Sequence, residues 1–319
     1  MSRLDPAIER QVTVDALEKR PPLHQRLRRF AGRPAHEKYA SIVQRFHRIF
    51  PKVPVLCRLS FGAWWVVGNS TIDSGLLWRG FETAELRFVE KFLEPGMCVL
   101  DVGAHHGLYT LLASKRVGSR GRVIAFEPSP RERLVLARNL RLNSSSNVRI
   151  ENYALGHEAS KAQLFLVGGG EDGCNSLRPP AVAATTRTVL VDVTSIDDYL
   201  LNASINIVDF VKLDVEGAER EVLLGASGLL GASSPPVILA EVQDIRTRPW
   251  GYPAREIVQL LDRAGYEWFR ILSSGLLAPA DIHEQSYDAN FVAIPRDRVA
   301  DVFRRLGGQL EAENCREAG

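Results

Sequence analysis

From Glu82 onward, short apolar runs alternate with amphipathic stretches, and this alternation limits the fold more than any other feature of the chain. Four runs have the length and the branched side chains of buried strands: 97–102, 122–128, 208–215 and 236–242. The stretch 129–143 has helical spacing, with Ser129 suited to the N-cap and Pro130 to the first helical position. Strands that alternate with helices in this way predict βαβ units and a mainly parallel sheet. The last apolar run, 290–295, follows a loop without a crossover helix, so we expect it to pair antiparallel.

Residues 1–80 depart from this pattern and form the first of two predicted domains, an N-terminal helical and β extension, the second domain being 81–319. The segment 23–50 is rich in Arg and His and has apolar residues at helical spacing, which predicts a solvated helix. A basic patch for an anionic partner or a membrane surface is the alternative, because clustered cations create a local field. The segment 53–80 is rich in aromatic and β-branched residues and predicts a strand or a hairpin.

The composition sets the broad class of the protein. Of 319 residues, 45% are hydrophobic and 24% are charged, which is close to the globular average and allows a sizeable core. A net charge of +2 gives no support for nucleic-acid binding over the whole surface. The sequence starts without the apolar core of a signal peptide, and no run approaches the ~18 apolar residues of a membrane span, so we expect a soluble, cytoplasmic protein. The four cysteines lack Cys-x-x-Cys spacing, which favours a reducing compartment: Cys57, Cys98, Cys174 and Cys315.

The turn in "VLDVGAHHGLYT", residues 99–110, joins a predicted strand to a predicted helix. In such folds ligands bind at the carboxyl edge of the sheet, close to free N–H groups. The turn lacks the Gly-Lys-Ser/Thr ending of a P-loop and the Gly-x-Gly-x-x-Gly of a dinucleotide site, so phosphate is the weaker choice of ligand. Asp101 at the strand end would repel a phosphate, but it would suit the ammonium group of an amino acid.

A second acid, Glu127, ends the next strand, where a carboxylate can accept both hydroxyls of a ribose. An unmodified ribose, an ammonium group and no pyrophosphate together describe S-adenosylmethionine. The adjacent His105 and His106 do not have the i, i+4 spacing of a helical zinc pair, and no cysteine lies near them. We therefore expect no zinc, and we expect at least one of the two to be a turn residue beside the cofactor.

At this point the sequence resembles the FkbM family of S-adenosylmethionine-dependent methyltransferases, over roughly residues 82–295. The motifs that carry the resemblance occur in the order of the family: "VLDVGAHHGLYT", "GRVIAFEPSP", "NLRLN", "NYALG", "VKLDVEGAE", "VLLGA" and "NFVAIP". The resemblance implies an α/β fold of the Rossmann-like class I methyltransferase type. This has a mainly parallel seven-stranded sheet with helices on both faces. It also implies an O-methyltransferase that acts on a hydroxyl of a sugar, a glycan, a polyketide or a similar secondary metabolite.

The resemblance also assigns cofactor residues by their position in the matching motifs. The loop on the methionine side of the cofactor is assigned to Asp101, Gly103, Ala104 and Gly107. Glu127 is assigned to the ribose. The adenine site is assigned to Pro128 and Ser129, with Asn152 and Ala154 opposite. The double histidine departs from the commoner Ala-Asn-x-Gly turn of the family. We place His105 with the cofactor and His106 within reach of the acceptor.

Methyl transfer requires that the acceptor is aligned and, for an alcohol, that its proton is removed. Asp214 ends the strand "VDFVKLDV" and is the first candidate for this role, with a helix cap or an ion pair to Lys212 as the alternatives. Glu241 ends the next strand and is placed at the acceptor pocket. Oxygen ligands from Asp214 and Glu241, with Gln243 and Asp244, would also suit Mg²⁺, but the spacing does not demand a metal and none is favoured.

The remaining predictions concern the acceptor and rival functions. Side chains expected near a sugar-like acceptor are Trp250, Tyr252, Asn175 and Ser176, with His283 as a distant candidate base. A nucleic-acid methyltransferase that uses the basic N-terminal segment is one alternative, although "KLDVEG" stands where an Asn/Asp-Pro-Pro-Tyr/Phe tetrapeptide would be expected. A non-catalytic binding module is the other. The expected partner is a small molecule or a glycan, and a homo-oligomer stays open.

Overall fold

The structure is a computed structural model that describes residues 28, 30–32, 34–50, 53, 55–68, 70–77, 80–168, 172–179 and 186–307. The chain divides into two compact units, Met1–Val53 and Pro54–Gly319. In the first unit, the helix expected within 23–50 is α3 (Ala35–Ile49). Among the described residues, no helix has both the length and the apolar character that a membrane crossing requires.

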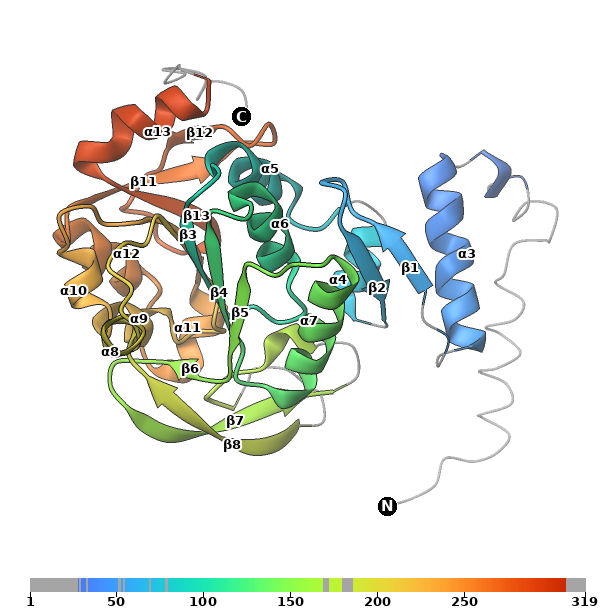
Figure 1. Cartoon of the computed structure of the whole chain (residues 1–319), viewed down its shortest axis with the longest axis horizontal. Helices are drawn as coiled ribbons and strands as arrows, with labels where there is room; N and C mark the ends of the chain where they lie inside the picture. Colours follow the sequence, from blue (N-terminus) through green and yellow to red (C-terminus); the bar gives the residue numbers. More distant parts are fainter. Residues whose placement is uncertain are drawn as a thin grey trace. The chain divides into compact units, whose positions relative to one another are not determined.

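The second unit is built on an eight-stranded sheet in the order β12-β11-β13-β10-β9-β3-β4-β5 (Figure 1). The five strands from β10 to β5 run parallel, whereas β13 is antiparallel to both of its neighbours, β10 and β11. The strands are β3 (Cys98–Val102), β4 (Arg122–Phe126), β5 (Val148–Glu151), β9 (Phe210–Leu213), β10 (Val237–Gln243), β11 (Tyr266–Ile271), β12 (Leu277–Pro279) and β13 (Asp288–Pro295). All residues of β3 and β9 are buried, as expected for central parallel strands that are covered on both faces.

The predicted mainly parallel sheet and the antiparallel last strand are therefore confirmed. Seven strands have the expected arrangement, and β12 adds a short eighth at the edge. β12 forms because a tight turn after β11 returns the chain onto that strand, with Gly275 at φ +79° and the N–H of Leu272 donating to the carbonyl of Leu276 at 2.8 Å. Such a short return carries no strong periodic signal in the sequence.

Helices cover both faces of the sheet (Figure 1). One face carries α5 (Thr83–Phe92), α6 (Leu108–Val117) and α7 (Pro130–Leu142), and the other carries α8 (Ile196–Asn202), α9 (Glu219–Leu224), α10 (Ser227–Leu230) and α12 (Arg255–Arg263). Shorter elements are α4 (Thr71–Leu77), α11 (Asp244–Thr247), α13 (Val299–Arg305) and the 3-10 turns η1 (Asp172–Cys174), η2 (Arg248–Trp250) and η3 (Arg296–Arg298). As predicted, α7 begins at Pro130 with Ser129 at the N-cap position.

A second sheet and a hairpin flank the main sheet. The second sheet has the order β6-β8-β7, from β6 (Ala154–Leu155), β7 (Ser160–Val167) and β8 (Thr186–Thr194). β7 and β8 flank a Gly-rich segment of the sequence, residues 168–185, of which 169–171 and 180–185 lie outside the described residues. The hairpin is β1 (Val55–Arg58) with β2 (Trp64–Val67), in antiparallel register.

Within the second unit, the hairpin packs on α7 through Asn139 of that helix and Asn143 at its C-cap. The N–H of Trp64 donates to Asn143 Oδ1 at 2.8 Å, and the N–H of Val66 donates to Asn139 Oδ1 at 3.2 Å. The boundary between the two compact units lies after Val53, inside the extension that the sequence pattern placed at 1–80. The division at residue 80 stays a prediction about where the methyltransferase domain begins.

Candidate active site

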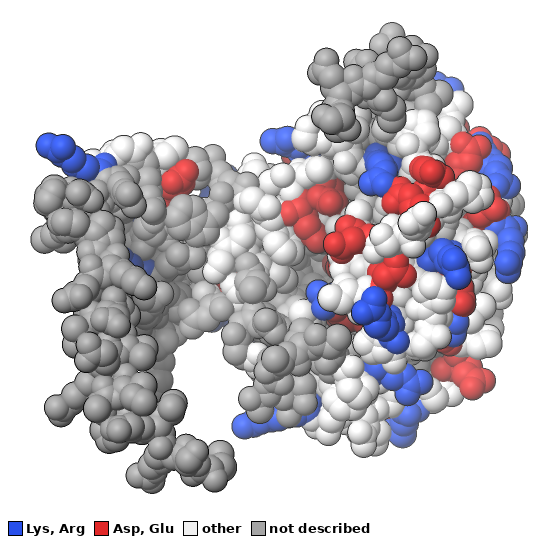
Figure 2. Space-filling view, turned by 180° about the vertical axis from the view of Figure 1, so that it is seen from behind, with Lys and Arg blue, Asp and Glu red and all other residues white. Residues whose placement is uncertain are grey.

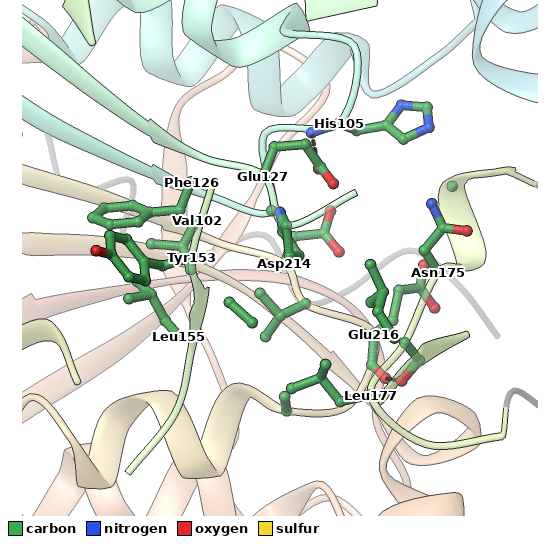
Figure 3. Close-up of a pocket in the computed structure, with 18 residues that line it drawn as sticks. Val102, His105, Phe126, Glu127, Tyr153, Leu155, Asn175, Leu177, Asp214 and Glu216 are labelled. Atoms are coloured by element: carbon green, nitrogen blue, oxygen red, sulfur yellow. Dashed lines mark hydrogen bonds between the residues drawn. The ribbon is translucent and has the colours of Figure 1, made fainter. Parts of the chain in front are cut away.

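A cavity at the carboxyl ends of β3, β4 and β9 spans about 580 Å³, including space that is open to solvent. Figure 3 shows apolar side chains of Val102, Phe126, Tyr153 and Leu155 on one side of it, with Glu127 and Asp214 in the middle and Asn175 and Glu216 opposite. The remaining lining residues are Gly103, His105, Pro128, Ala154, Leu164, Gly173, Ser176, Leu177, Val215 and Ala218. The cavity thus has an apolar slot next to a polar, acidic half.

The turn after β3 is held close to two neighbouring strands. The N–H groups of Gly103 and Ala104 both donate to the carbonyl of Phe126, at 3.1 and 3.0 Å. Gly103 has φ +85°, and a Cβ added there would lie 1.8 Å from the carbonyl oxygen of Asp214. Gly107, at φ +91°, is the N-cap of α6, and its Cβ would meet Leu136 at 2.4 Å. Glycine is therefore required at both positions for conformation and for space.

Asp101, near the end of β3, is buried against α6 beside the turn. It is 2% exposed, does not line the cavity, and accepts a hydrogen bond from the hydroxyl of Thr110 on α6. Burial raises the pKa of this carboxyl to about 6. Its neighbour Val102 lines the cavity, because successive side chains of a strand point to opposite faces. A direct contact of Asp101 with the cofactor stays a prediction.

Glu127 lines the cavity at the end of β4 with both carboxylate oxygens oriented. Oε1 accepts the N–H of Ser129 and Oε2 accepts the N–H of His105, each at 2.8 Å. Burial raises the pKa of this carboxyl to about 7, and the two N–H donors oppose that rise. Each oxygen keeps a second lone pair, so the group can accept hydrogen bonds from two hydroxyls of a ligand.

The predicted adenine residues are distributed differently from expectation. Pro128 and Ala154 line the cavity, but Asn152 is exposed and its side chain does not line it. Tyr153, which the sequence reasoning missed, lines the cavity instead. Ser129 is fully buried, and its hydroxyl donates to Glu132 rather than to the cavity.

The two adjacent histidines differ in their access to the cavity. His105 lines the cavity with φ 48°, but Figure 3 shows its ring directed away from Glu127 and Asp214. His106 is 8% exposed, does not line the cavity, and lies with its ring 6.4 Å from that of Trp65 on β2. His106 therefore has no direct access to the cavity, and a catalytic role for it stays a prediction.

The histidine rings stack at 3.8 Å between centroids. Burial, and then the neighbouring His106, lower the pKa of His105 to about 3, so its imidazole is neutral. Ligand atoms of His105, His106 and Glu132 lie within 4.8 Å of one another, a grouping that the linear spacing did not indicate. The carboxylate of Glu132 is already engaged by Arg131, whose Nε lies 2.7 Å away.

The acidic half of the cavity centres on Asp214, directly after β9. Its Oδ2 lies 2.9 Å from Nζ of Lys212, a side chain that is 2% exposed, whereas the side chain of Asp214 is 29% exposed. Burial opposes ionisation of Asp214, but Lys212 outweighs it and lowers the pKa of the carboxyl. The predicted ion pair is confirmed. The alternative helix cap is not seen: Ala218 occupies the N-cap of α9 without a side-chain hydrogen bond, and Oε1 of Glu219 accepts the N–H groups of Val215 and Gly217 in the turn before the helix.

Two further acids lie beside Asp214. Carboxylate oxygens of Asp214, Glu216 and Glu241 lie within 4.8 Å of one another, and Nε of Arg246 lies 3.1 Å from Glu216 Oε2. Burial, and then Asp214, raise the pKa of Glu241 well above its usual value and that of Glu216 to about 8. Burial and the neighbouring carboxylate thus favour the protonated forms of Glu241 and Glu216 relative to a glutamate in water.

Behind Lys212 lie two further polar residues, Tyr109 and Glu82, that the sequence pattern did not indicate. Nζ of Lys212 lies 5.0 Å from the ring centroid of Tyr109, and the hydroxyl of Tyr109 donates to Glu82 Oε2 at 2.7 Å. Glu82 precedes α5 in left-handed conformation, at φ 42°. The sequence around Glu82 predicts only the start of a helix, because Glu82 and its partner Tyr109 are 27 residues apart.

Several residues that were expected near the acceptor make structural hydrogen bonds instead. Tyr252 and Trp250 donate to the carbonyls of Gly217 and Glu216, at 2.6 and 3.3 Å, and do not line the cavity. Asp244 accepts the N–H groups of Ala254 and Tyr287, so its carboxylate closes a loop. The lining does not include Gln243 or His283 either, whereas Asn175 and Ser176 belong to it as expected.

The comparisons with known proteins identify the family of the chain. Residues 101–268, just over half of the chain, match the profile described as the Methyltransferase FkbM domain. The chain belongs to the FkbM methyltransferase family. This FkbM chain is thus a member of a family of S-adenosylmethionine-dependent methyltransferases, and the sheet described above is the class I fold that the resemblance implied.

Curated relatives cover parts of the FkbM chain. Methyltransferase 1 of Beauveria bassiana is 34% identical over 143 residues, which are 40% of this chain and 57% of that protein. The AMB antimetabolite synthetase AmbE of Pseudomonas aeruginosa is 27% identical over 210 residues, 55% of this chain and 10% of that protein. The chain therefore spans little more than half of the first relative and a tenth of the second. Fibrillarin of Aeropyrum pernix, solved with natively bound S-adenosylmethionine, is 15% identical with a TM-score of 0.39, over 76% of this chain and 83% of that chain.

Proposed function

We propose that this protein transfers a methyl group from S-adenosylmethionine to a hydroxyl of a sugar, a glycan or a secondary metabolite. The observation that carries the proposal is the ionised carboxylate of Asp214 in the cavity wall, held by the buried Lys212 at 2.9 Å. A hydroxyl acceptor needs a hydrogen-bond acceptor beside the transferred methyl, and an ionised carboxylate supplies one.

The residues of the cavity fit the cofactor. Glu127 offers two oriented carboxylate oxygens, which suits the two hydroxyls of a ribose. Phe126, Tyr153 and Leu155 form an apolar slot beside it that suits the flat adenine ring. The turn at Gly103 brings backbone to the opposite wall without a side chain in the way. Glu127 would hold the ribose, and Tyr153 with Phe126 the adenine.

The bound cofactor supplies a methyl group that is already activated by positively charged sulfur. The chain therefore has to align the acceptor oxygen and take its proton. Because Lys212 lowers the pKa of Asp214, the carboxylate is ready before the acceptor binds, and it accepts the hydrogen bond of the hydroxyl. A carboxylate of low pKa is a weak base, so its main contribution is orientation, and the proton passes on to solvent as the new ether forms.

We propose that the reaction does not require a metal. Asp214, Glu216 and Glu241 could contact a cation, but Lys212 and Arg246 already provide two positive charges at this cluster. The raised pKa of Glu241 favours its neutral form, which reduces the negative charge available to a cation. The remaining polar groups, Asn175 and Ser176, are suited to the further hydroxyls of a polyhydroxylated acceptor.

Titration calorimetry with S-adenosylhomocysteine, with and without Mg²⁺, tests the cofactor site. We expect micromolar binding that is lost in Glu127→Ala, kept in the exposed control Glu158→Ala, and unaffected by Mg²⁺. Methyl transfer to glycosides and polyketide alcohols then tests the chemistry. Asp214→Asn should lower kcat by about 100-fold or more without changing the affinity for S-adenosylhomocysteine. If Asp214→Asn keeps full activity, the proposed role of this acid is wrong. If the wild-type protein binds no cofactor, the enzyme proposal itself fails.

A further inference from the structure

The helix α3, Ala35–Ile49, carries an exposed apolar face that the proposed reaction does not use. Ile42 is 58% exposed, Phe46 39%, Ile49 66% and the adjoining Phe50 49%. Residues three and four positions apart lie on one side of a helix, so these four side chains form a single strip. The rings of Phe46 and Phe50 lie 5.0 Å apart between centroids, which makes the strip continuous at its C-terminal end.

The segment around this strip has a strong excess of positive charge. Residues 23–52 contain eight Lys and Arg residues and one acid, Glu37, which gives this segment a net charge of +7. The whole chain has a net charge of +2, so all the other residues together carry −5. On the Pro54–Gly319 unit, acidic and basic side chains are interspersed over the face shown in Figure 2. The charge of the sequence is therefore divided between a cationic segment and an acidic remainder.

The cations border the apolar strip in the helix. At 100° per residue, Lys38 and Arg45 project along one edge of the sector that holds Ile42, Phe46 and Ile49. Long basic side chains at such an edge can lay their stems along an apolar surface while the charged group reaches the polar side. An apolar strip with basic flanks is the pattern of a helix that lies in the plane of a membrane interface.

We infer that α3 docks on an anionic membrane surface, with its apolar strip among the lipid chains and its cations at the headgroup phosphates. Binding to a nucleic acid would use the charge but would leave Ile42, Phe46 and Ile49 in water. Pairing with a second copy would cover the strip but would bring two segments of charge +7 together. An anionic lipid surface satisfies both features at once.

Sedimentation of the full chain with lipid vesicles tests the inference. One set of vesicles is phosphatidylcholine and the other is phosphatidylcholine mixed with phosphatidylserine. We expect binding to the mixed vesicles only, and weaker binding as salt rises. Ile42→Glu should lower this binding by about tenfold or more, because it removes apolar burial and adds a negative charge. Lys38→Gln should lower it by about fivefold, the loss of one cation.

The matched control is Leu201→Glu on α8, where the leucine is 79% exposed. It makes the same change of charge in the other unit and should bind vesicles like the wild type. Circular dichroism and S-adenosylhomocysteine binding should be unchanged in both variants, which separates loss of docking from loss of folding. Vesicle binding that is equal with and without phosphatidylserine, or that Ile42→Glu leaves intact, would overturn the inference. So would salt-sensitive binding to duplex DNA without any vesicle binding, or a dimer that Ile42→Glu dissociates and vesicles do not affect.

Discussion

Replacing Gly103 by alanine should disable the site more than it destabilises the protein. The added Cβ would lie 1.8 Å from the carbonyl oxygen of Asp214, and contacts of this kind below 3.0 Å essentially never occur. The turn after β3 and the end of β9 must therefore move apart by more than an ångström. That movement opposes the hydrogen bond from the N–H of Asp214 to the carbonyl of Val102, now 3.1 Å.

The size of the effect can be worked from these contacts. A left-handed φ costs a residue with a Cβ about 1–2 kcal/mol, and a weakened hydrogen bond adds about 1 kcal/mol. The expected loss in the free energy of unfolding is therefore about 2–3 kcal/mol. A misplacement of about 1 Å at a reacting group costs about 100-fold in rate, so the displaced Asp214 should lower kcat far more than stability.

Gly96→Ala is the matched control for this prediction. Gly96 has φ +98° but no atom within 4 Å of an added Cβ, so the substitution isolates the conformational cost. Thermal unfolding should show a fall of a few degrees in Tm for Gly96→Ala and a larger fall for Gly103→Ala. Calorimetry with S-adenosylhomocysteine and a methyl-transfer assay should show losses for Gly103→Ala alone. Equal behaviour of the two variants in both assays would refute the argument that close approach to Asp214 requires this glycine.

Three further predictions follow from the polar groups. Lys212→Met should raise the pKa of Asp214, so the acidic limb of the pH profile of kcat should move to higher pH. Lys212→Arg should keep the limb closer to its wild-type position. An unmoved limb in Lys212→Met would contradict the role of Asp214 as the ionised group. Glu241→Gln should change kcat at pH 7 by less than about threefold, because the raised pKa of Glu241 favours the neutral form that glutamine imitates. A large loss would show that its ionised form is used. Asn139→Leu removes two buried hydrogen bonds, to Val66 and to the carbonyl of His106, and should cost about 2–4 kcal/mol in denaturant unfolding, against no more than about 0.5 kcal/mol for the exposed Leu134→Ala.

Features that depend on local order were predictable from the sequence. The parallel strands, the helix start at Ser129 and Pro130 and the placement of Glu127 at a strand end all follow from short-range patterns. The Lys212–Asp214 pair was predictable because residues two apart on a strand share a face. The same rule would have directed Asp101 away from the cavity, since Val102 occupies the opposite face.

Features that depend on distant partners or on a single torsion were not predictable. The positive φ of His105 sends His106 toward β2, and nothing in the letters "GAHHG" indicates that torsion. The layer of Glu82 and Tyr109 behind Lys212 joins segments that only the folded sheet brings together. The docking of the hairpin on Asn139 is likewise a contact across 73 positions.

The position of β13 has a consequence for the order in which the molecule can be completed during synthesis. The last of the described strands along the chain, β13 (Asp288–Pro295), does not join an edge but fills the gap between β10 and β11. Until it emerges, both of those strands keep one unpaired edge, and the half of the sheet that holds β11 and β12 has no hydrogen-bonded link to the half that holds the cavity. A nascent chain that stalls before Asp288 therefore exposes two unpaired strand edges at once, and each of them is a template for pairing with another chain.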